Sequence, residues 1–517
     1  MREARRLQYI VGGCLWLLAC SSLSSAGPTA PTAPPATAAV PTAVAPTAAP
    51  APAPAAKTAP PPTGDQVFTL GGPAGIVAPL LGINMGPAPH GKGTGDLEAL
   101  YKERGVTLIR THDYKGAFDL TDESYANTDA MLARIQKGGF QTYLRLGNSF
   151  GAGATQAGTA ELAAGMLAML DHVQAASAPT NRVQYVEIWN EPDNTEFWTQ
   201  GQQAYVDLYI AVSRKIRAKH PTVKIGGPAL TPAGVLTSRG RAFVEEFLNA
   251  VKRAGAPLDF LSWHLYSNHP EEFASAAQTY REASIKAGFG DLEQHITEWN
   301  TAFKASGEHG GKKGKAGDGG GREGKAGGRE GKAGGRGGLG EGDRDPAEQA
   351  ARWAEKTDPQ LRIGARSSAL TTASWIALQM GGVDQSLFYR GPDPAPYPST
   401  FYGMFWNDGR PKPTGWAALL WKKMVDHPER LELSGSTKGP IWALAGRSPT
   451  GETAVLLANE SEHTASWGLA CPANAVLPVQ TESVRAPADA VLAGTQPDCS
   501  GVLEPYEVRL LTWKRSG

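Results

Sequence analysis

The chain has 517 residues, of which 41% are hydrophobic and 19% are charged. This composition supports a sizeable folded core, and it excludes a mini-protein, a collagen-like chain and a wholly disordered chain. Lysine plus arginine equals aspartate plus glutamate at 50 residues each. No net charge therefore attracts nucleic acid or anionic lipid to the whole surface, and we expect no nucleic-acid partner.

The first residues have the pattern of an export signal, which we assign to 1–20. Three arginines precede an apolar run over 7–19, which is too short to span a bilayer comfortably. The run ends in Leu17-Leu18-Ala19-Cys20, which resembles a bacterial lipobox, so we expect Cys20 to carry a lipid anchor at the cell envelope. The alternative is cleavage near Ser25-Ala26, which gives a secreted protein. In both cases we expect export, and contact with a membrane only through the lipid.

Four cysteines are present in the chain: Cys14, Cys20, Cys471 and Cys499. Cys14 leaves with the signal and Cys20 carries lipid in this interpretation. The other two remain in an oxidising compartment, so we expect a disulfide between Cys471 and Cys499. The cysteine spacing does not resemble a zinc site.

Two segments have a composition that cannot bury a core. Residues 21–66 are mostly alanine, proline and threonine, which predicts an extended disordered linker. Residues 306–343 are rich in glycine, lysine, arginine and glutamate and contain a direct repeat, which predicts a disordered surface insertion.

Between these segments, short apolar runs alternate with stretches of helical period. Eight strands are expected over 81–85, 107–111, 141–146, 185–190, 223–226, 260–266, 295–299 and 385–389. Helices are expected over 95–104, 129–137, 160–172, 202–219, 241–253, 270–286, 345–380 with a break, and 414–425. This rhythm predicts an α/β fold, a (β/α)8 TIM barrel over 67–428. Residues 429–517 change to short strand-like runs and predict a C-terminal all-β, sandwich-like domain, which Val67–Leu70 can join.

Two glutamates close predicted strands of this barrel. Glu191 follows the fourth strand in Trp189-Asn190-Glu191-Pro192, where proline cannot continue the strand. Glu298 ends the seventh strand in Thr297-Glu298-Trp299-Asn300. Strands four and seven lie on roughly opposite sides of the barrel, so the two carboxyls can meet across its mouth. Two carboxyls about 5 to 5.5 Å apart are what double displacement at a sugar's anomeric carbon requires.

These two motifs resemble those of retaining glycosidases that carry both glutamates at the ends of strands four and seven, and within that clan glycoside hydrolase family 39. This family includes β-xylosidases and α-L-iduronidases, and the resemblance covers about 81–420. It implies that Glu191 is the acid and base, that Glu298 is the nucleophile, and that the reaction needs no metal and no cofactor.

The resemblance also implies roles for other residues at strand ends. Arg110 and Tyr266 resemble residues that contact the nucleophile, and His112 and His264 resemble glycone-binding histidines. Asn190 is expected to bind the sugar 2-hydroxyl, whereas Tyr389, like Trp198 and Trp299, can stack on a sugar ring. The alternative for Arg110 and Tyr266 is a structural ion pair or packing, and for the two histidines it is a hydrogen-bond network at the rim. For any one of the 13 tryptophans, core packing is the default interpretation.

The sequence departs from the family's xylosidases after the eighth strand, where Arg390 follows Tyr389. An arginine in this place suits a glycone or a branch that bears a carboxylate. The leading hypothesis is a retaining exo-glycosidase of the β-xylosidase type that acts on an oligo- or polysaccharide. One alternative is an endo-acting hydrolase of a microbial exopolysaccharide, and another is a non-catalytic carbohydrate-binding lipoprotein. The glycone, the anomer and the oligomeric state stay open.

Overall fold

The computed structural model describes residues 64–87, 97–114, 116–148, 157–290, 292–302, 357–394, 400–435, 439–470 and 475–514. The export signal, Cys20, most of the linker over 21–66 and the insertion over 306–343 lie outside these residues. None of the helices in the described ranges combines the length and apolar character that a bilayer crossing requires.

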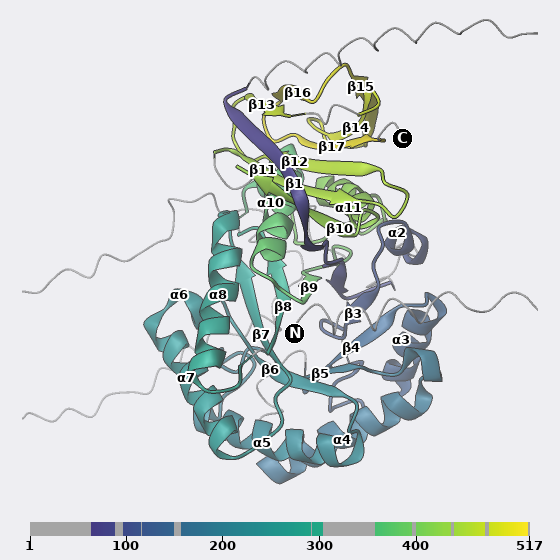
Figure 1. The fold of residues 1–517 in the computed structure, drawn as a ribbon. Coiled ribbons are helices and arrows are strands. Elements are labelled where there is room, and N and C mark those ends of the chain that lie inside the picture. The colour runs from purple at the N-terminus through teal and green to yellow at the C-terminus, as the bar shows by residue number, and fades with distance from the viewer. Residues whose placement is uncertain are drawn as a thin grey trace, which may run out of the picture. The chain divides into compact units, whose positions relative to one another are not determined.

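Eight parallel strands close into a barrel (Figure 1). In order around the barrel they are β2 (Gly82–Asn84), β3 (Leu108–Arg110), β4 (Gln141–Leu146), β5 (Tyr185–Ile188), β6 (Lys224–Leu230), β7 (Phe260–Tyr266), β8 (Glu293–Asn300) and β9 (Gln385–Phe388). Each strand expected from the sequence is present, and β2 pairs with β9 to complete the ring. The fourth and seventh strands of the barrel are therefore β5 and β8.

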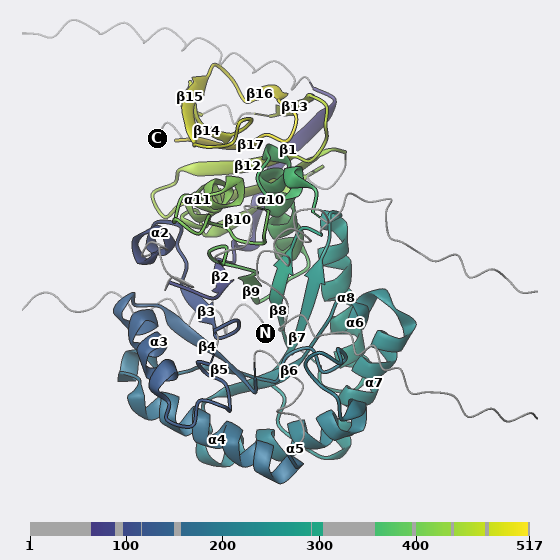
Figure 2. The ribbon, with the colours of Figure 1, turned by 180° about the vertical axis from the view of Figure 1, so that it is seen from behind.

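Helices surround this ring of strands (Figure 2). The described helices are α2 (Glu98–Glu103), α3 (Ala126–Lys137), α4 (Thr159–Ala176), α5 (Gly201–Lys219), α6 (Ala233–Leu236), α7 (Ser238–Arg253), α8 (Pro270–Lys286), α10 (Ala365–Met380) and α11 (Pro413–Val425), with 3₁₀ turns η3 (Pro179–Asn181) and η5 (Pro359–Leu361). Of the helix expected over 345–380, residues 345–356 lie outside the described ranges, η5 is the break, and α10 is the helix. The short α6 was not expected.

The local sequence accounts for where these helices begin. Helix α8 starts at Pro270, whose missing N–H costs no hydrogen bond in the first turn. The negative charges of Glu271 and Glu272 in that turn interact favourably with the positive end of the helix dipole. Helix α7 follows Thr237, whose side-chain oxygen accepts a hydrogen bond from the Gly240 N–H at 2.9 Å. Helix α8 thus begins shortly after β7, whereas α7 follows β6 with the short α6 between them.

A second sheet of nine strands follows the barrel in sequence. Its order is β15 (Leu492–Gln496), β14 (Val479–Val484), β17 (Val508–Trp513), β12 (Thr453–Asn459), β11 (Ile441–Arg447), β10 (Glu429–Ser434), β1 (Gln66–Ile76), β13 (Ala465–Leu469) and β16 (Ser500–Leu503). The expected boundary at 428–429 falls between α11 and β10. Cys499 is disulfide-bonded, and Cys471, its predicted partner, lies outside the described residues.

Strand β1 corrects the expected start of the barrel. The domain bounds assigned residues from 67 onward to the barrel, with the alternative that Val67–Leu70 joins the all-β domain. Strand β1 pairs antiparallel with β10 and parallel with β13, which confirms that alternative. Figure 1 shows this strand, in purple, beside the yellow-green strands of the second sheet. The reason is that a strand can complete a sheet with partners hundreds of residues away, so Val67–Leu70 joins the all-β domain and the barrel begins at β2.

The second sheet has two different apolar faces because side chains alternate along a strand. On β12, Leu456 belongs to the large core that the barrel and its helices build, whereas Leu457 belongs to a separate core inside the β domain. On β11, Trp442 and Ala443 divide in the same way. One face of the sheet therefore continues the barrel core over α10 and α11, and the other closes the sandwich-like domain on itself.

Candidate active site

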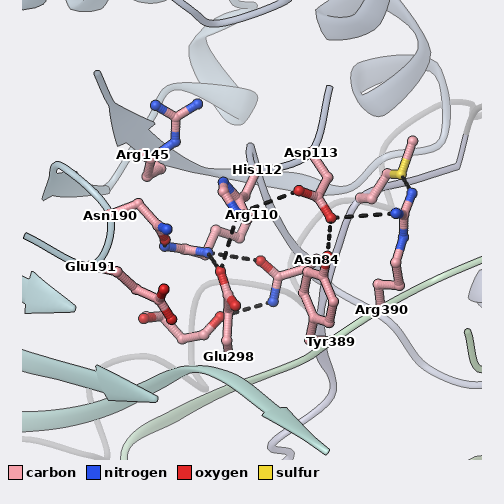
Figure 3. A network of polar contacts seen from close by, with 12 residues as sticks. Asn84, Arg110, His112, Asp113, Arg145, Asn190, Glu191, Glu298, Tyr389 and Arg390 are labelled. Carbon is pink, nitrogen blue, oxygen red and sulfur yellow. Dashed lines mark hydrogen bonds and ion pairs between the residues drawn. The ribbon is translucent and has the colours of Figure 1, made fainter. Parts of the chain in front are cut away.

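Polar side chains gather where the barrel strands end. Asn84, Arg110, Tyr266 and Glu298 lie at or near the carboxyl ends of their strands, and Glu191 lies just after β5. The carboxyl ends of parallel strands meet at one rim of a barrel, so these residues converge although the chain separates them widely. Figure 3 shows most of this network.

Arg110 is the centre of the network, and its side chain is fully buried. Its Nε donates to Glu187 Oε2 at 2.7 Å, and its Nη1 donates to Glu298 Oε1 at 2.7 Å. Nη1 also donates to Asn84 Oδ1 at 3.0 Å, and Nη2 donates to Asn190 Oδ1 at 2.7 Å. One guanidinium therefore fixes side chains from β2, β8 and the end of β5 relative to one another.

The charges of Arg110 and Glu187 stabilise each other. Burial alone lowers the pKa of Arg110, but Glu187 and Glu298 raise it above its ordinary value. Burial alone raises the pKa of Glu187, but Arg110 and His264 bring it below its ordinary value. Both groups therefore stay ionised around neutral pH, as a buried and hydrogen-bonded pair requires.

Donors surround Glu298, as the sequence led us to expect. Besides Arg110, the Tyr266 hydroxyl donates to Glu298 Oε2 at 2.9 Å, and His112 Nε2 lies 3.3 Å from Oε1. Burial raises the pKa of Tyr266 well above its ordinary value, so this hydroxyl keeps its proton. Burial also raises the pKa of Glu298; His264 and Arg110 act against this rise, and Glu191 adds to it.

Glu191 has fewer and less charged partners. Its Oε1 lies 2.9 Å from His264 Nδ1, and its Oε2 accepts a hydrogen bond from Asn194 Nδ2 at 3.2 Å. Its side chain is 12% exposed, compared with 6% for Glu298. The backbone of Glu191 has φ 45° and that of Trp189 has φ 73°, left-handed values that cost on the order of 1 kcal/mol or more for non-glycine residues and cluster at functional sites.

The two glutamates face each other. The ligand-type atoms of Glu191, His264 and Glu298 all lie within 4.8 Å of one another, a spacing that also suits a metal ion. Arg110 and Tyr266 already bind the Glu298 oxygens, so protein groups alone can hold this carboxylate in place. Burial alone lowers the pKa of His264, but Glu298 and Glu191 raise it above its ordinary value. The absence of a metal stays a prediction.

Comparisons with known proteins find a partial match to a known family. Residues 181–306, which include both glutamates, match the model of glycosyl hydrolases family 39. Over these residues the chain is similar to glycosyl hydrolases family 39. A curated relative, beta-xylosidase of Geobacillus stearothermophilus, is 27% identical over 136 residues. That alignment covers 23% of this chain and 26% of the relative, so the chain spans about a quarter of that protein's length in the match.

Solved structures show the same fold over most of the chain. A glucosidase from Croceicoccus marinus has a TM-score of 0.62 at 18% identity, covering 87% of this chain and 99% of its own. A monomeric beta-xylosidase from Caulobacter crescentus CB15 has a TM-score of 0.60 at 17% identity, covering 87% and 100% respectively. These similarities concern the fold alone, a barrel with an accompanying β domain.

The family resemblance pointed to further residues, and the structure brings them together at this rim. Burial and the nearby Arg110 lower the pKa of His112 well below its ordinary value, so its ring is neutral. Asn190 Nδ2 is buried without a hydrogen-bond partner among the described residues, so it is free to donate to a ligand. The Tyr389 hydroxyl donates to Asp113 Oδ2, and its ring meets the Tyr266 ring edge-on with centroids 6.1 Å apart.

The structure agrees with core packing, the default interpretation, for two tryptophans, and it corrects the expectation for Arg390. Trp198 and Trp299 are buried in the barrel core and present no ring to a sugar; the Trp299 indole N–H donates to Ser386 Oγ at 2.7 Å. Arg390 is buried as well, and its Nη1 lies 3.3 Å from Asp113 Oδ2. The cation that suggested a carboxylate on the glycone is therefore already paired within the protein.

Sequence reasoning missed Asn84, Asp113 and Glu187. A signal for Glu187 was present, because a carboxylate inside the apolar strand Tyr185–Ile188 must find a cation if that strand is buried. Arg110 is likewise a charged residue in a buried apolar strand, Leu108–Arg110, and must find a carboxylate. Pairing the two would have predicted the centre of the network.

We expect Arg110→Met to destabilise the protein strongly. Its removal leaves Glu187 buried without a cation, which costs about 3–5 kcal/mol in comparable pairs. Adding Glu187→Gln should restore part of the lost free energy of unfolding, measured by urea denaturation. As a control, Arg410→Met removes a 73% exposed arginine paired with Asp408 and should change stability by less than about 1 kcal/mol. An unchanged urea midpoint for Arg110→Met contradicts the mutual dependence of Arg110 and Glu187.

Proposed function

We propose that the chain is a retaining glycoside hydrolase that cleaves O-glycosidic bonds by double displacement, most like an exo-acting β-xylosidase. The observation that carries this proposal is the opposition of Glu191 and Glu298, whose facing oxygens lie within 4.8 Å. Retaining enzymes hold their two carboxyls about 5 to 5.5 Å apart, whereas inverting enzymes need about 6.5 to 9.5 Å to seat a water molecule. The spacing in this site favours direct attack by a carboxylate.

Glu298 suits the role of the nucleophile. The hydrogen bonds from Arg110 and Tyr266 hold its two oxygens in place and favour its ionised form. In the first step a Glu298 oxygen forms a bond to the anomeric carbon while the bond from that carbon to the leaving oxygen breaks. The leaving oxygen takes a proton from the Glu191 carboxylic acid, and the sugar becomes an ester of Glu298.

Glu191 suits the role of the acid and base. It is the more exposed of the two carboxyls, so an aglycone or a water molecule can reach it. In the second step the Glu191 carboxylate takes a proton from water, the water oxygen bonds to the anomeric carbon, and the ester bond to Glu298 breaks. His264 Nδ1, 2.9 Å from Glu191 Oε1, orients this carboxyl towards the site.

Neutral donors complete the site. The free Asn190 Nδ2 is placed beside Glu191 and is suited to bind the sugar 2-hydroxyl, an interaction that tightens in the transition state. The non-catalytic alternative requires the loss of a carboxylate or of its donors, and the described site retains both. The named function of the beta-xylosidase relative supports a xylose-type glycone.

We expect Glu298→Gly to reduce turnover of an activated aryl glycoside by about a thousandfold or more, because it removes the attacking oxygen. Azide should enter the vacated space and yield a glycosyl azide, detected by mass spectrometry. The matched control is Glu293→Gln on the same strand, whose carboxylate pairs with Lys224 away from the site and whose substitution should leave turnover unchanged. Near wild-type turnover of Glu298→Gly without an azide adduct rules out the proposed nucleophile.

The pH dependence should follow the raised pKa of Glu298. Attack needs ionised Glu298, so the acidic limb of kcat/KM should lie above the ordinary glutamate pKa of about 4.3. Because Glu191 contributes to this rise, Glu191→Gln should move the limb to lower pH by about half a unit or more. A dinitrophenyl glycoside serves as substrate, since its leaving group needs no protonation. A limb that stays in place or moves to higher pH refutes the coupling of the two carboxyls.

A further inference from the structure

A third carboxylate lies beside the two glutamates, and the proposed mechanism does not use it. Asp113 directly follows His112, and its Oδ2 accepts a hydrogen bond from the Tyr389 hydroxyl. Arg390 Nη1 lies 3.3 Å from the same oxygen. The side chains of Asp113 and Arg390 are each 4% exposed, a value close to the 6% of Glu298. Asp113 is therefore buried to about the same degree as the proposed nucleophile.

The position of Asp113 is on the glycone side of the site. A single atom, His112 Nε2, lies 3.4 Å from Asp113 Oδ1 and 3.3 Å from Glu298 Oε1. Figure 3 shows Asp113 on the far side of Glu298 from Glu191. Glu191 faces the leaving group in the proposed reaction, so Asp113 faces the part of the sugar that is remote from the aglycone.

Arg390 and Tyr389 fix this carboxylate. The Arg390 guanidinium lies 5.8 Å from the Phe401 ring centroid and 6.0 Å from that of Tyr389. Asp113 itself has φ 64°, a left-handed backbone value that is rare for a non-glycine residue. Arg390 is thus a positioning residue, and its charge is neutralised by Asp113.

The charges at the rim disfavour an anionic sugar. Three buried arginines of this rim each have a carboxylate partner: Arg110 with Glu187 and Glu298, Arg145 with Asp119, and Arg390 with Asp113. A carboxylate on the glycone would meet Asp113 and Glu298 with no unpaired cation among them, and a buried unpaired charge is costly. A neutral sugar instead donates a hydroxyl proton to Asp113 Oδ1, which among the described residues has a long contact of 3.4 Å to His112 Nε2.

We infer that Asp113, held by Arg390 and Tyr389, is a specificity-determining residue that selects neutral glycones and rejects uronides. This inference rests on the proposed glycoside hydrolase function. It reverses the expectation that Arg390 itself receives a carboxylate, because that arginine is already paired. It also predicts that removing the charge of Asp113 frees Arg390 for an anionic sugar.

The test compares nitrophenyl β-xyloside, β-glucoside, α-L-arabinoside and β-glucuronide on wild type and Asp113→Asn. For wild type we expect kcat/KM on the best neutral substrate to exceed that on the glucuronide by about a hundredfold or more. Asp113→Asn should lower kcat/KM on the neutral substrate by about tenfold and raise it on the glucuronide. The ratio of the neutral-substrate value to the glucuronide value should therefore fall. A merely structural defect lowers both values together and leaves the ratio unchanged, which overturns the inference.

The matched control is Asp259→Asn, which removes an aspartate paired with Arg217 just before β7, at the opposite end of that strand from Tyr266. For this variant, the ratio of kcat/KM on the neutral substrate to kcat/KM on the glucuronide should equal the wild-type ratio.

If Asp113→Asn does not fold, as judged by circular dichroism, inhibition of the wild-type enzyme provides the test: xylose should inhibit and glucuronic acid should not. Equal inhibition by both sugars, or a wild-type preference for the glucuronide, overturns the inference but leaves the hydrolase proposal standing. No turnover of any glycoside overturns the hydrolase proposal itself.

Discussion

The buried guanidinium of Arg110 is the interaction on which the candidate site depends. It binds Glu187 and Glu298 at once and also holds Asn84 and Asn190. A cation in this position is stable only because two carboxylates compensate it, and the carboxylates are stable there only because of the cation. This mutual dependence fixes the orientation of Glu298 before any ligand arrives, so binding a sugar requires little rearrangement of the protein.

The closed parallel barrel brings the second glutamate, Glu191, to the same rim as Glu298. Glu191 and Glu298 come from strands β5 and β8, and a closed parallel barrel sends both side chains to the same rim. His264 on β7 lies between the two, 2.9 Å from an oxygen of Glu191 and 3.8 Å from one of Glu298. One face of the second sheet packs on α10 and α11 and continues the barrel core. It therefore supports the helix between β8 and β9 and the helix between β9 and β10.

The strand and helix pattern and the two glutamate motifs were predictable because they depend on local sequence. Each barrel strand is a short apolar run, and each glutamate stands at the end of one. That Val67–Leu70 joins the all-β domain was predicted only as an alternative, because these residues pair with strands hundreds of positions away and no local feature identifies those partners. The pairing of Arg390 with Asp113 was missed for the same reason: an arginine after a strand has the same sequence signature whether it meets a ligand or an aspartate of another loop.

The central claim is that Glu298 bonds covalently to the sugar while Glu191 stands opposite. The most direct measurement traps this ester with an activated glycoside that carries fluorine at C2, which slows its hydrolysis, followed by proteolysis and mass spectrometry. We predict that the peptide containing Glu298 gains the mass of one fluorosugar, and that the addition disappears as activity returns. Turnover of the trapping reagent without any adduct, or an adduct on Glu191 instead, contradicts the claim.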